Sequence, residues 1–421
     1  MRIETDESQA GAAQGGAHRK TALEGIRVVD LTQFEAGTSC TESLAWMGAE
    51  VIKIEQPGRG EQGRRATSLK GDTDSVFFLL LNANKKSVTC NLKHPEGLRL
   101  VQDLIRNADI FVENFGPGVI ERLGLGYEEV RKLNPRIIYA QIKGFAPDGP
   151  FANFLAFDAI AQAAGGSVSV TGEADGRPLK PGINVADTGT GLHCTIGILA
   201  ALHQRHFTGE GQRIEVAMQE AIINFGRIGW AAQALHNAPA PRVDNQSIIA
   251  GTSPSEVYPC RGGGANDYIY IYTTRAGNHH WEALMKIMGR EDLSSDPRFL
   301  TPGERAKNYL AVDAEISRWT RTQDKVEAMK VLGAAGVPAS AIFDTQELSD
   351  DEHLRKRGAF VTVDHPQHGK FVMPGWPVKM SGSPVTVEAA PLLGSDTDEI
   401  YGRLLGKSPD ELRRMRDEKI I

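Results

Sequence analysis

The chain has 421 residues, of which 41% are hydrophobic and 24% charged, a composition that excludes disordered, collagen-like and coiled-coil proteins. Its 47 Lys and Arg residues against 53 Asp and Glu residues give a net charge of −6, and no long basic run is present. Nucleic acid is therefore not expected as the main partner. The four cysteines form no C-x-x-C pair, which indicates a reducing compartment and neither a disulfide framework nor a zinc site.

The first 20 residues lack the apolar core of a signal peptide and are rich in Ala, Gly, Ser and charged residues. We expect them to form a flexible extension. No uncharged apolar stretch reaches the roughly 18 to 20 residues that a membrane helix needs. A soluble, cytoplasmic chain is expected.

From residue 26 onward, short β-branched runs alternate with amphipathic helical stretches. Residues 26–31 and 50–55 are typical of buried strands, and 42–48 end the helix between them. A helix is expected to begin after Pro95, followed by strands at 109–113 and 136–142. Because strands that alternate with helices form parallel sheets, this half predicts an open, doubly wound α/β domain with helices on both faces.

The composition and the pattern of predicted elements change in the second half of the chain. An apolar helix is expected at 191–205, then a strand at 213–218 and a helix at 219–230. Residues 237–267 are rich in Pro, Ser, Asn and Gly and are typical of a linker. A smaller α/β segment follows, with a strand at 268–273 and helices near 280–288 and within 303–334. The predicted division is an extension (1–20), a large domain (21–224), a linker with a small domain (225–335) and a return segment that completes the large domain (336–421).

One glycine motif follows the second strand. GRGEQG at 58–63 matches the G-x-G-x-x-G of dinucleotide-binding domains, but that motif requires a helix that begins within it. The residues after it are polar and have no apolar helical face. We therefore interpret 58–63 as a solvent-exposed loop.

A second motif, DTGTG at 187–191, contains a triplet that occurs in aspartic proteases. That chemistry needs two such triplets, so one triplet before a helix does not support it. Asp187 can cap a helix that starts near Thr190. It can also be a carboxylate held in a glycine-lined turn near backbone N–H groups, where it faces a ligand and acts as a nucleophile. His203 and His206 have a metal-like spacing, but no matching ligand completes a site, so no metal is expected.

Several segments together resemble one known family, the class III CoA-transferases, and within it the formyl-CoA transferase type. The superfamily also includes α-methylacyl-CoA racemase. The likeness is collinear over about residues 22–421. It is carried by LEGIRVVDLTQFEAGTSCTESLAWMGAEVIKIEQPGRG (23–60), LNANKKSVTCNLKHPEG (81–97), ADIFVENFGPGVIERLGLGYEEVRKLNPRIIYAQIKGF (108–145), INVADTGTGLHCTIGILAALHQRHFTGEGQRIEVAMQEAIIN (183–224) and APLLGSDTDEI (390–400).

The resemblance implies a fold, a partner and a reaction. It implies a large Rossmann-like domain built from both ends of the chain, a smaller central α/β domain, and an interlocked homodimer. Asp187 matches the family's catalytic aspartate, which takes up the acyl group as a mixed anhydride and then CoA as an aspartyl thioester. Asp158 matches an acidic residue that supports catalysis, although a charge at a helix N-terminus is its simpler interpretation. Glu35 stands where the formyl-CoA transferases have a glutamine that contacts the reacting acyl group.

The resemblance also implies where coenzyme A and a small carboxylic acid bind. The loop near the thioester is Gln33, Phe34, Glu35 and Ala36. Leu81, Asn82, Ala83 and Asn84 are expected to line the adenine region, with Lys85 beside them. The remaining wall is Asn114, Phe115 and Gly116, and Arg122 is placed to meet a CoA phosphate.

This chain departs from the family pattern at several positions. Besides Glu35, Gln56 replaces an arginine for CoA and Leu155 replaces a lysine, while 245–259 is shorter than the glycine-rich loop of the formyl-CoA transferases. These departures argue against oxalate as the acceptor and leave succinate or another organic acid open. Phe157 occupies the position of the racemase histidine, which favours transfer over epimerisation because racemisation needs a second base. An acyl-CoA epimerase and a non-catalytic CoA-binding protein are the alternatives.

Overall fold

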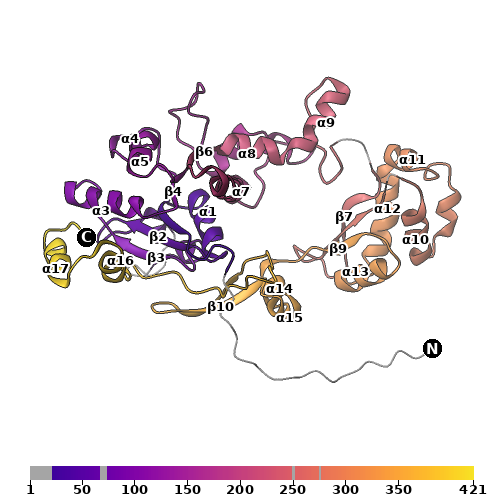
Figure 1. Cartoon of the computed structure of the whole chain (residues 1–421). Coiled ribbons are helices and arrows are strands. Elements are labelled where there is room, and N and C mark those ends of the chain that lie inside the picture. Colours follow the sequence, from indigo (N-terminus) through magenta and orange to yellow (C-terminus); the bar gives the residue numbers. More distant parts are fainter. Residues whose placement is uncertain (1–20, 67–73, 249–251, 275) are drawn as a thin grey trace.

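The computed structural model describes residues 21–66, 74–248, 252–274 and 276–421 (Figure 1). The expected N-terminal extension lies outside these ranges. So do residues 67–73, which follow the glycine motif, and 249–251, within the segment compared with the glycine-rich loop.

A six-stranded, wholly parallel sheet forms the centre of the large lobe. Its strand order is β3-β2-β1-β4-β5-β6, so the chain runs outward from β1 in one direction and then returns past β1 in the other. In such sheets ligands bind at the carboxyl edge where the order reverses, which here lies between β1 and β4. The doubly wound α/β prediction is confirmed. The strands are β1 (Arg27–Leu31), β2 (Glu50–Glu55), β3 (Lys86–Thr89), β4 (Ile110–Glu113), β5 (Ile138–Lys143) and β6 (Gln212–Ala217).

Helices cover both faces of this sheet. Alternate residues of β1 enter two separate cores, Val28 on one face and Val29 on the other, as the two-residue period of a strand requires. The first face carries α1 (Ala36–Ala45), α6 (Asp158–Ala164), α7 (Val185–Thr208) and α8 (Met218–Phe225). The second face carries α3 (Pro95–Arg106), α5 (Tyr127–Leu133) and the C-terminal helices α16 (Thr397–Leu405) and α17 (Pro409–Asp417). The chain terminus thus completes the layer that the first half begins (Figure 1).

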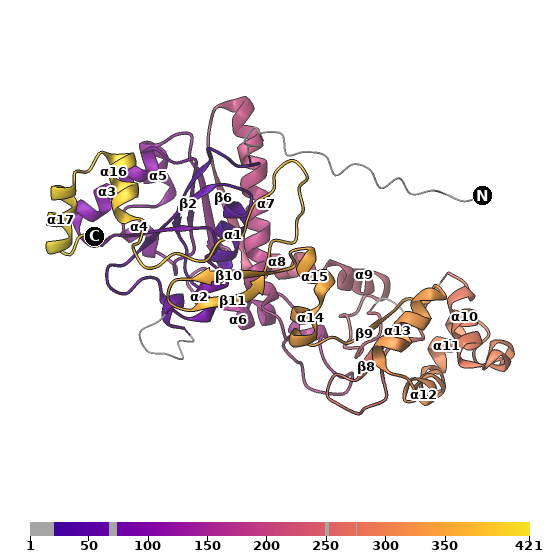
Figure 2. The same ribbon diagram turned by 90° about the horizontal axis from the view of Figure 1, so that it is seen from below.

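Helices α1 and α7 pack closely along much of their length. Small residues make this possible: a Cβ added at Gly191 would lie 2.6 Å from the Ala36 carbonyl oxygen and 2.9 Å from the Ser39 Cβ. Among the described helices, α7 alone is long and apolar enough to span a membrane, but it packs on α1, α8 and the sheet (Figure 2). This contact brings the N-termini of α1 and α7 together at the edge of the sheet.

A second lobe stands apart from the sheet, and the two figures agree on this separation (Figures 1 and 2). It has its own core around the buried Trp281 and an antiparallel sheet in the order β7-β8-β9. Its elements are β7 (Ser255–Pro259), β8 (Tyr268–Tyr272), α10 (His279–Met288), η3 (Glu291–Ser295), α11 (Pro302–Lys307), α12 (Tyr309–Thr320), α13 (Lys325–Ala334) and β9 (Ala339–Ala341).

The chain reaches this lobe through α9 and leaves it through two short helices and a hairpin (Figure 1). These elements are α9 (Arg227–His236), α14 (Thr345–Asp350), α15 (Glu352–Lys356), β10 (Phe360–His365) and β11 (Gly369–Pro374). Four short elements in the large lobe complete the structure: η1 (Gln62–Arg65), α2 (Val76–Leu79), α4 (Val119–Arg122) and η2 (Val168–Val170).

Several local predictions were wrong. The predicted helix at 219–230 is two helices, which meet at Gly226. The predicted linker at 237–267 contains β7, because the apolar side of this short strand packs in the small lobe. β9 lies beyond residue 335, so the small sheet takes a strand from the predicted return segment.

The loop at 58–63 is not simply solvent-exposed. Glu61 is buried, and Arg64, just after the motif, is only 2% exposed. The Arg64 guanidinium donates to both Glu55 oxygens at the end of β2, at 2.6 and 2.7 Å, and its Cζ lies 3.8 Å from the Phe78 ring centroid. A polar sequence therefore forms a buried ion pair beside the sheet edge.

Candidate active site

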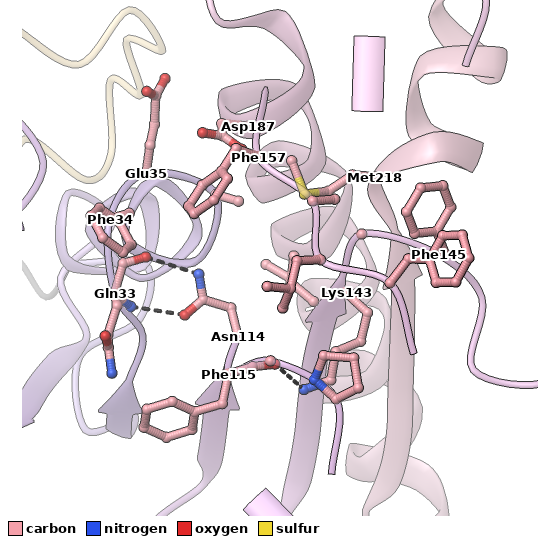
Figure 3. A pocket seen from close by; sticks show the side chains of 18 of the residues that line it. Gln33, Phe34, Glu35, Asn114, Phe115, Lys143, Phe145, Phe157, Asp187 and Met218 are labelled. Atoms are coloured by element: carbon pink, nitrogen blue, oxygen red, sulfur yellow. Dashed lines mark hydrogen bonds between the residues drawn. The ribbon is translucent and has the colours of Figure 1, made fainter. Parts of the chain in front are cut away.

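A pocket opens at the carboxyl edge of the sheet, where β1, β4 and β5 end. The loops after β1 and β4 are joined by a pair of hydrogen bonds: the Gln33 N–H donates to Asn114 Oδ1 at 2.8 Å, and Asn114 Nδ2 donates to the Gln33 carbonyl at 2.9 Å (Figure 3). Because parallel strands end at the same edge, residues 81 positions apart meet here. The N-terminal end of α7 adds Asp187 to the same pocket.

Asp187 lies in the first turn of α7 and is not the helix cap. The helix begins at Val185, with Asn184 as the N-cap, so the prediction of a cap before Thr190 was wrong. Asp158 instead accepts the free N–H groups of this turn: Ala186 donates to its Oδ1 at 3.0 Å and Asp187 at 3.3 Å. The Asp187 side chain is therefore not needed to satisfy the helix end.

Asp158 acts on the pocket through the backbone. It is the first residue of α6, and besides the two α7 N–H groups it accepts a hydrogen bond from Gln162 Nε2 at 2.6 Å. Its carboxylate is thereby directed at the start of α7 and holds that turn against α6. The pocket lining does not include it. Asp158 therefore contacts the backbone of the turn that carries Asp187, and a role for it in catalysis stays a prediction.

Glu35 holds the other side of the same turn. Its Oε1 accepts a hydrogen bond from Thr188 Oγ1 and its Oε2 accepts one from Asn184 Nδ2, both at 2.8 Å. The donors stand on either side of Asp187 in the sequence. Glu35 is 8% exposed and is the N-cap residue of α1, where its side chain makes no cap hydrogen bond. The two helix starts are thus tied together by one carboxylate.

Burial raises the pKa of Asp187 from its ordinary value of 3.8 to about 7, and the nearby Glu35 and Asp158 carboxylates raise it further in the same direction. Among the described residues, none donates a hydrogen bond to the Asp187 carboxylate. An unpaired carboxylate with a pKa near neutrality, facing a cavity, is typical of a functional group. It is available both as a nucleophile and as a proton acceptor.

Apolar side chains form most of the remaining wall. The Phe157 ring meets Phe34 edge to face, with ring centroids 6.0 Å apart, and lies between Phe34 and Met218 in Figure 3. Lys143, at the end of β5, reaches the pocket floor, where its Nζ donates to Glu113 Oε2 at 2.9 Å and to the Phe115 carbonyl at 2.6 Å. The ammonium group is therefore held by protein acceptors.

Six of the residues predicted to bind CoA line this pocket together with Asp187 and Glu35. They are Gln33, Phe34, Ala36, Asn114, Phe115 and Gly116. The structure does not place Leu81, Asn82, Ala83, Asn84, Lys85 or Arg122 in the pocket lining. Arg122 is exposed at the end of α4, beside Gly118.

Polar side chains of residues 81–85 make their contacts with other parts of the same chain. Lys85 is buried, with its Nζ 3.3 Å from Asp30 Oδ2 and 2.8 Å from Asn82 Oδ1. Burial lowers the pKa of this ammonium group, partly offset by Asp30. Asn84 Nδ2 donates to the carbonyl of Thr386 in the C-terminal segment. An adenine contact for this run stays a prediction, and Lys85 in particular is turned toward Asp30.

A second hollow continues along the sheet edge. It shares Gln33, Gln62 and Phe115 with the first pocket and extends past the ends of β2 and β3 to Gln56 and Lys93. The two hollows together follow the carboxyl edge from Asp187 across the reversal point of the sheet. A long, narrow ligand can occupy both.

The pocket residues that sequence reasoning missed include Lys143, Phe145, Phe154 and Met218. Lys143 has a usable signal, because it is the last residue of a predicted parallel strand and such positions face the ligand edge. The three apolar residues carry no such signal. In the sequence these residues cannot be distinguished from ordinary core positions. Only the tertiary structure places a cavity beside them.

A doubly wound parallel sheet, with an unpaired carboxylate in a pocket at its carboxyl edge, is an arrangement typical of α/β enzymes. The chain matches CoA-transferase family III over residues 23–397, and it belongs to that family.

Comparisons with individual proteins agree with this family membership. A formyl-CoA:oxalate CoA-transferase of Streptomyces coelicolor is 41% identical over 411 residues, covering 95% of this chain and 99% of that protein. Another, from Rhodopseudomonas palustris, is 40% identical over 415 residues, covering 94% of this chain and 96% of that protein. The crystal structure of a CAIB/BAIF family protein from Brucella suis aligns with a TM-score of 0.80 at 29% identity, covering 91% of this chain and 99% of that one. The predicted family is confirmed.

Proposed function

We propose that this CoA-transferase moves CoA from an acyl-CoA donor to a free carboxylic acid, with the Asp187 carboxylate as the covalent nucleophile. The observation that carries the proposal is the unpaired Asp187 carboxylate at the pocket, between two helix starts that Glu35 ties together. The names of the relatives make formyl-CoA and oxalate the first substrate pair to test.

The exchange divides into four steps that need no net proton. The Asp187 carboxylate attacks the thioester carbonyl, the C–S bond breaks, and CoA thiolate leaves a mixed anhydride. The thiolate then attacks the aspartyl carbonyl, releasing the donor acid as a carboxylate and leaving an aspartyl-CoA thioester. The acceptor carboxylate attacks that thioester to form a new anhydride, from which the thiolate takes the acceptor acyl group and frees Asp187.

The surroundings suit these steps. A carboxylate with a pKa near 7 is more nucleophilic than an ordinary Asp, and it is half ionised at neutral pH. The first turn of α1, which Glu35 does not cap with its side chain, supplies backbone N–H groups beside Ala36 for the oxyanion of each tetrahedral intermediate. The apolar wall of Phe34 and Phe157 limits water access to the anhydride. CoA would lie along the two connected hollows of the sheet edge.

The test is to trap the covalent intermediate. The purified chain is incubated with acyl-CoA and then with hydroxylamine, and the peptide that contains Asp187 is analysed by mass spectrometry. The expected result is a hydroxamate at Asp187 in wild type and in the control Asp175→Asn, which changes an exposed loop carboxylate. Normal CoA exchange by Asp187→Ala would overturn the proposal.

The epimerase alternative needs a second base at the pocket. The described residues that line it include no histidine, and Phe157 occupies the position that the racemases fill with one. Deuterium incorporation at the α-carbon without any acceptor acid would favour that alternative.

The homodimer also stays a prediction. Large apolar side chains are exposed along α7 and α9, among them Ile196, Phe207, Ile228 and Leu235, and a second copy would cover them. Light scattering of the purified chain tests this, with twice the chain mass expected.

A further inference from the structure

The pocket beside Asp187 is larger than a small acyl group needs. Its cavity volume is about 260 Å³. An apolar cavity of about 150 Å³ already holds benzene in another protein. The thioester end of CoA has to share this pocket with the acyl group, and beside it an oxalyl group, with two carboxyl carbons and no ring, would fill less of the space than a larger acyl group. The space suits an acyl group with a ring-sized substituent.

One part of the wall of this space is apolar, beside the polar Gln33, Gln62 and Asn114. Phe154 and Phe157 from the loop before α6, Phe34 from the loop after β1, and Met218 at the start of α8 all line it. Phe154 is 58% exposed and Phe157 61% exposed, so both rings present unburied surface. Aromatic rings favour edge-to-face or offset contact with another ring, worth about 0.5 to 1.5 kcal/mol beyond burial. A substrate ring between them would bury that surface.

The charges disfavour a second carboxylate on the substrate. Among the described residues that line the pocket, the cations are limited to Lys143, whose Nζ is already bound to Glu113 and the Phe115 carbonyl. Glu35 and Asp187 contribute two carboxyl groups to the same space. A dicarboxylic acid would bring a further negative charge into a partly buried, acidic cavity without a free partner for it, which is costly.

We propose that the site acts on monocarboxylic acids, and on their CoA thioesters, whose acyl group carries an aryl or similarly bulky apolar substituent, in preference to oxalate or succinate. This rests on the proposed transfer through Asp187 and specifies its substrate class. It would separate this chain from relatives that are named for oxalate. Phe157 is the specificity-determining residue, because its ring is both exposed and in contact with Phe34.

The experiment measures isotopic self-exchange. Each labelled free acid is incubated with its own unlabelled CoA thioester, and label in the thioester is followed. Because donor and acceptor carry the same acyl group, one acid at a time is tested and the reaction has no net driving force. The pairs are 3-phenylpropionate, propionate, succinate and oxalate. We expect kcat/KM for 3-phenylpropionate to exceed that for succinate and oxalate by about tenfold or more, which corresponds to about 1.4 kcal/mol in the transition state.

Two variants make the test specific. Phe157→Ala should lower 3-phenylpropionate exchange about tenfold more than propionate exchange, because only the larger acyl group reaches the ring. The matched control is Phe151→Ala, in the same loop, where Phe151 packs on Phe145 and Phe154 but does not line the pocket. It should retain the wild-type selectivity.

The outcomes are distinguishable. Faster exchange of succinate or oxalate than of 3-phenylpropionate overturns the substrate class and leaves the proposed function standing. Equal selectivity in wild type and Phe157→Ala also overturns it. Absence of exchange with every pair, in protein that is folded by circular dichroism, counts against the proposed transfer itself.

Discussion

Replacing Asp187 by Asn should stabilise the fold above neutral pH while abolishing CoA transfer. Burial beside Glu35 and Asp158 raises the pKa of Asp187 from 3.8 to about 7. A carboxyl with a higher pKa in the folded than in the unfolded chain binds its proton more tightly when folded. Its contribution to stability is therefore fully present below about pH 4 and is lost as the pH rises to about 7. Asn carries no such proton and escapes this loss.

The size of the pH-dependent loss of stability follows from the shift in the Asp187 pKa. One pKa unit corresponds to about 1.4 kcal/mol, so the loss from about pH 4 to about pH 7 is about 4 kcal/mol if the shift is fully expressed. Somewhat more than half of this loss of stability occurs between about pH 5 and about pH 8. Because Asp187 is partly exposed, we expect the stability difference between Asp187→Asn and wild type to grow by about 2 kcal/mol over that range.

Urea unfolding followed by tryptophan fluorescence measures this difference at the two pH values. Asp175→Asn, in an exposed turn, is the control for the loss of one negative charge. A stability difference for Asp187→Asn that is equal at the two pH values would refute the reasoning. It would mean that Asp187 titrates as an ordinary carboxyl and is not held in a costly environment.

Two further predictions concern carboxylates at the same edge of the sheet. Glu35→Gln removes a negative charge that disfavours ionisation of Asp187, so its pKa should fall and the acid limb of the pH–kcat/KM profile for CoA exchange should move to lower pH; an unmoved limb contradicts this. Arg64→Ala leaves Glu55 buried without its bidentate partner and should lower the free energy of unfolding by about 3 to 5 kcal/mol, as urea titration can measure. The double variant Arg64→Met with Glu55→Gln should recover part of that loss, whereas a loss below about 1 kcal/mol for Arg64→Ala would show that the pair is not structural.

The sheet was predictable because its signals are local. The runs at 26–31 and 50–55 are β-branched and separated by a helical stretch, and alternation of this kind leads to parallel strands with a shared ligand edge. The helix after Pro95 was equally clear: Pro95 is its first residue, and Leu100, Val101 and Leu104 face the core. These features depend on residues within a few positions of one another.

The contacts around Asp187 could not be predicted from the sequence, because they form only in the folded chain. Thr188 donates to Glu35 across 153 positions of sequence, and no pattern near either residue predicts that bond. The same holds for the helix cap, because the α7 N–H groups are satisfied by Asp158 from another helix.

The sequence alone indicated the alternation of strands and helices that forms a parallel sheet in the first half, and, through the motif at 187–191 and the family resemblance, Asp187 as the carboxylate to examine. The tertiary structure decided that Arg64 is buried, that Lys143 and the apolar side chains of Phe145, Phe154 and Met218 line the pocket, and that Lys85 turns toward Asp30. The physical reason is that periodicity reports which face of an element is apolar. Whether a charged side chain is buried depends on partners brought close only by folding.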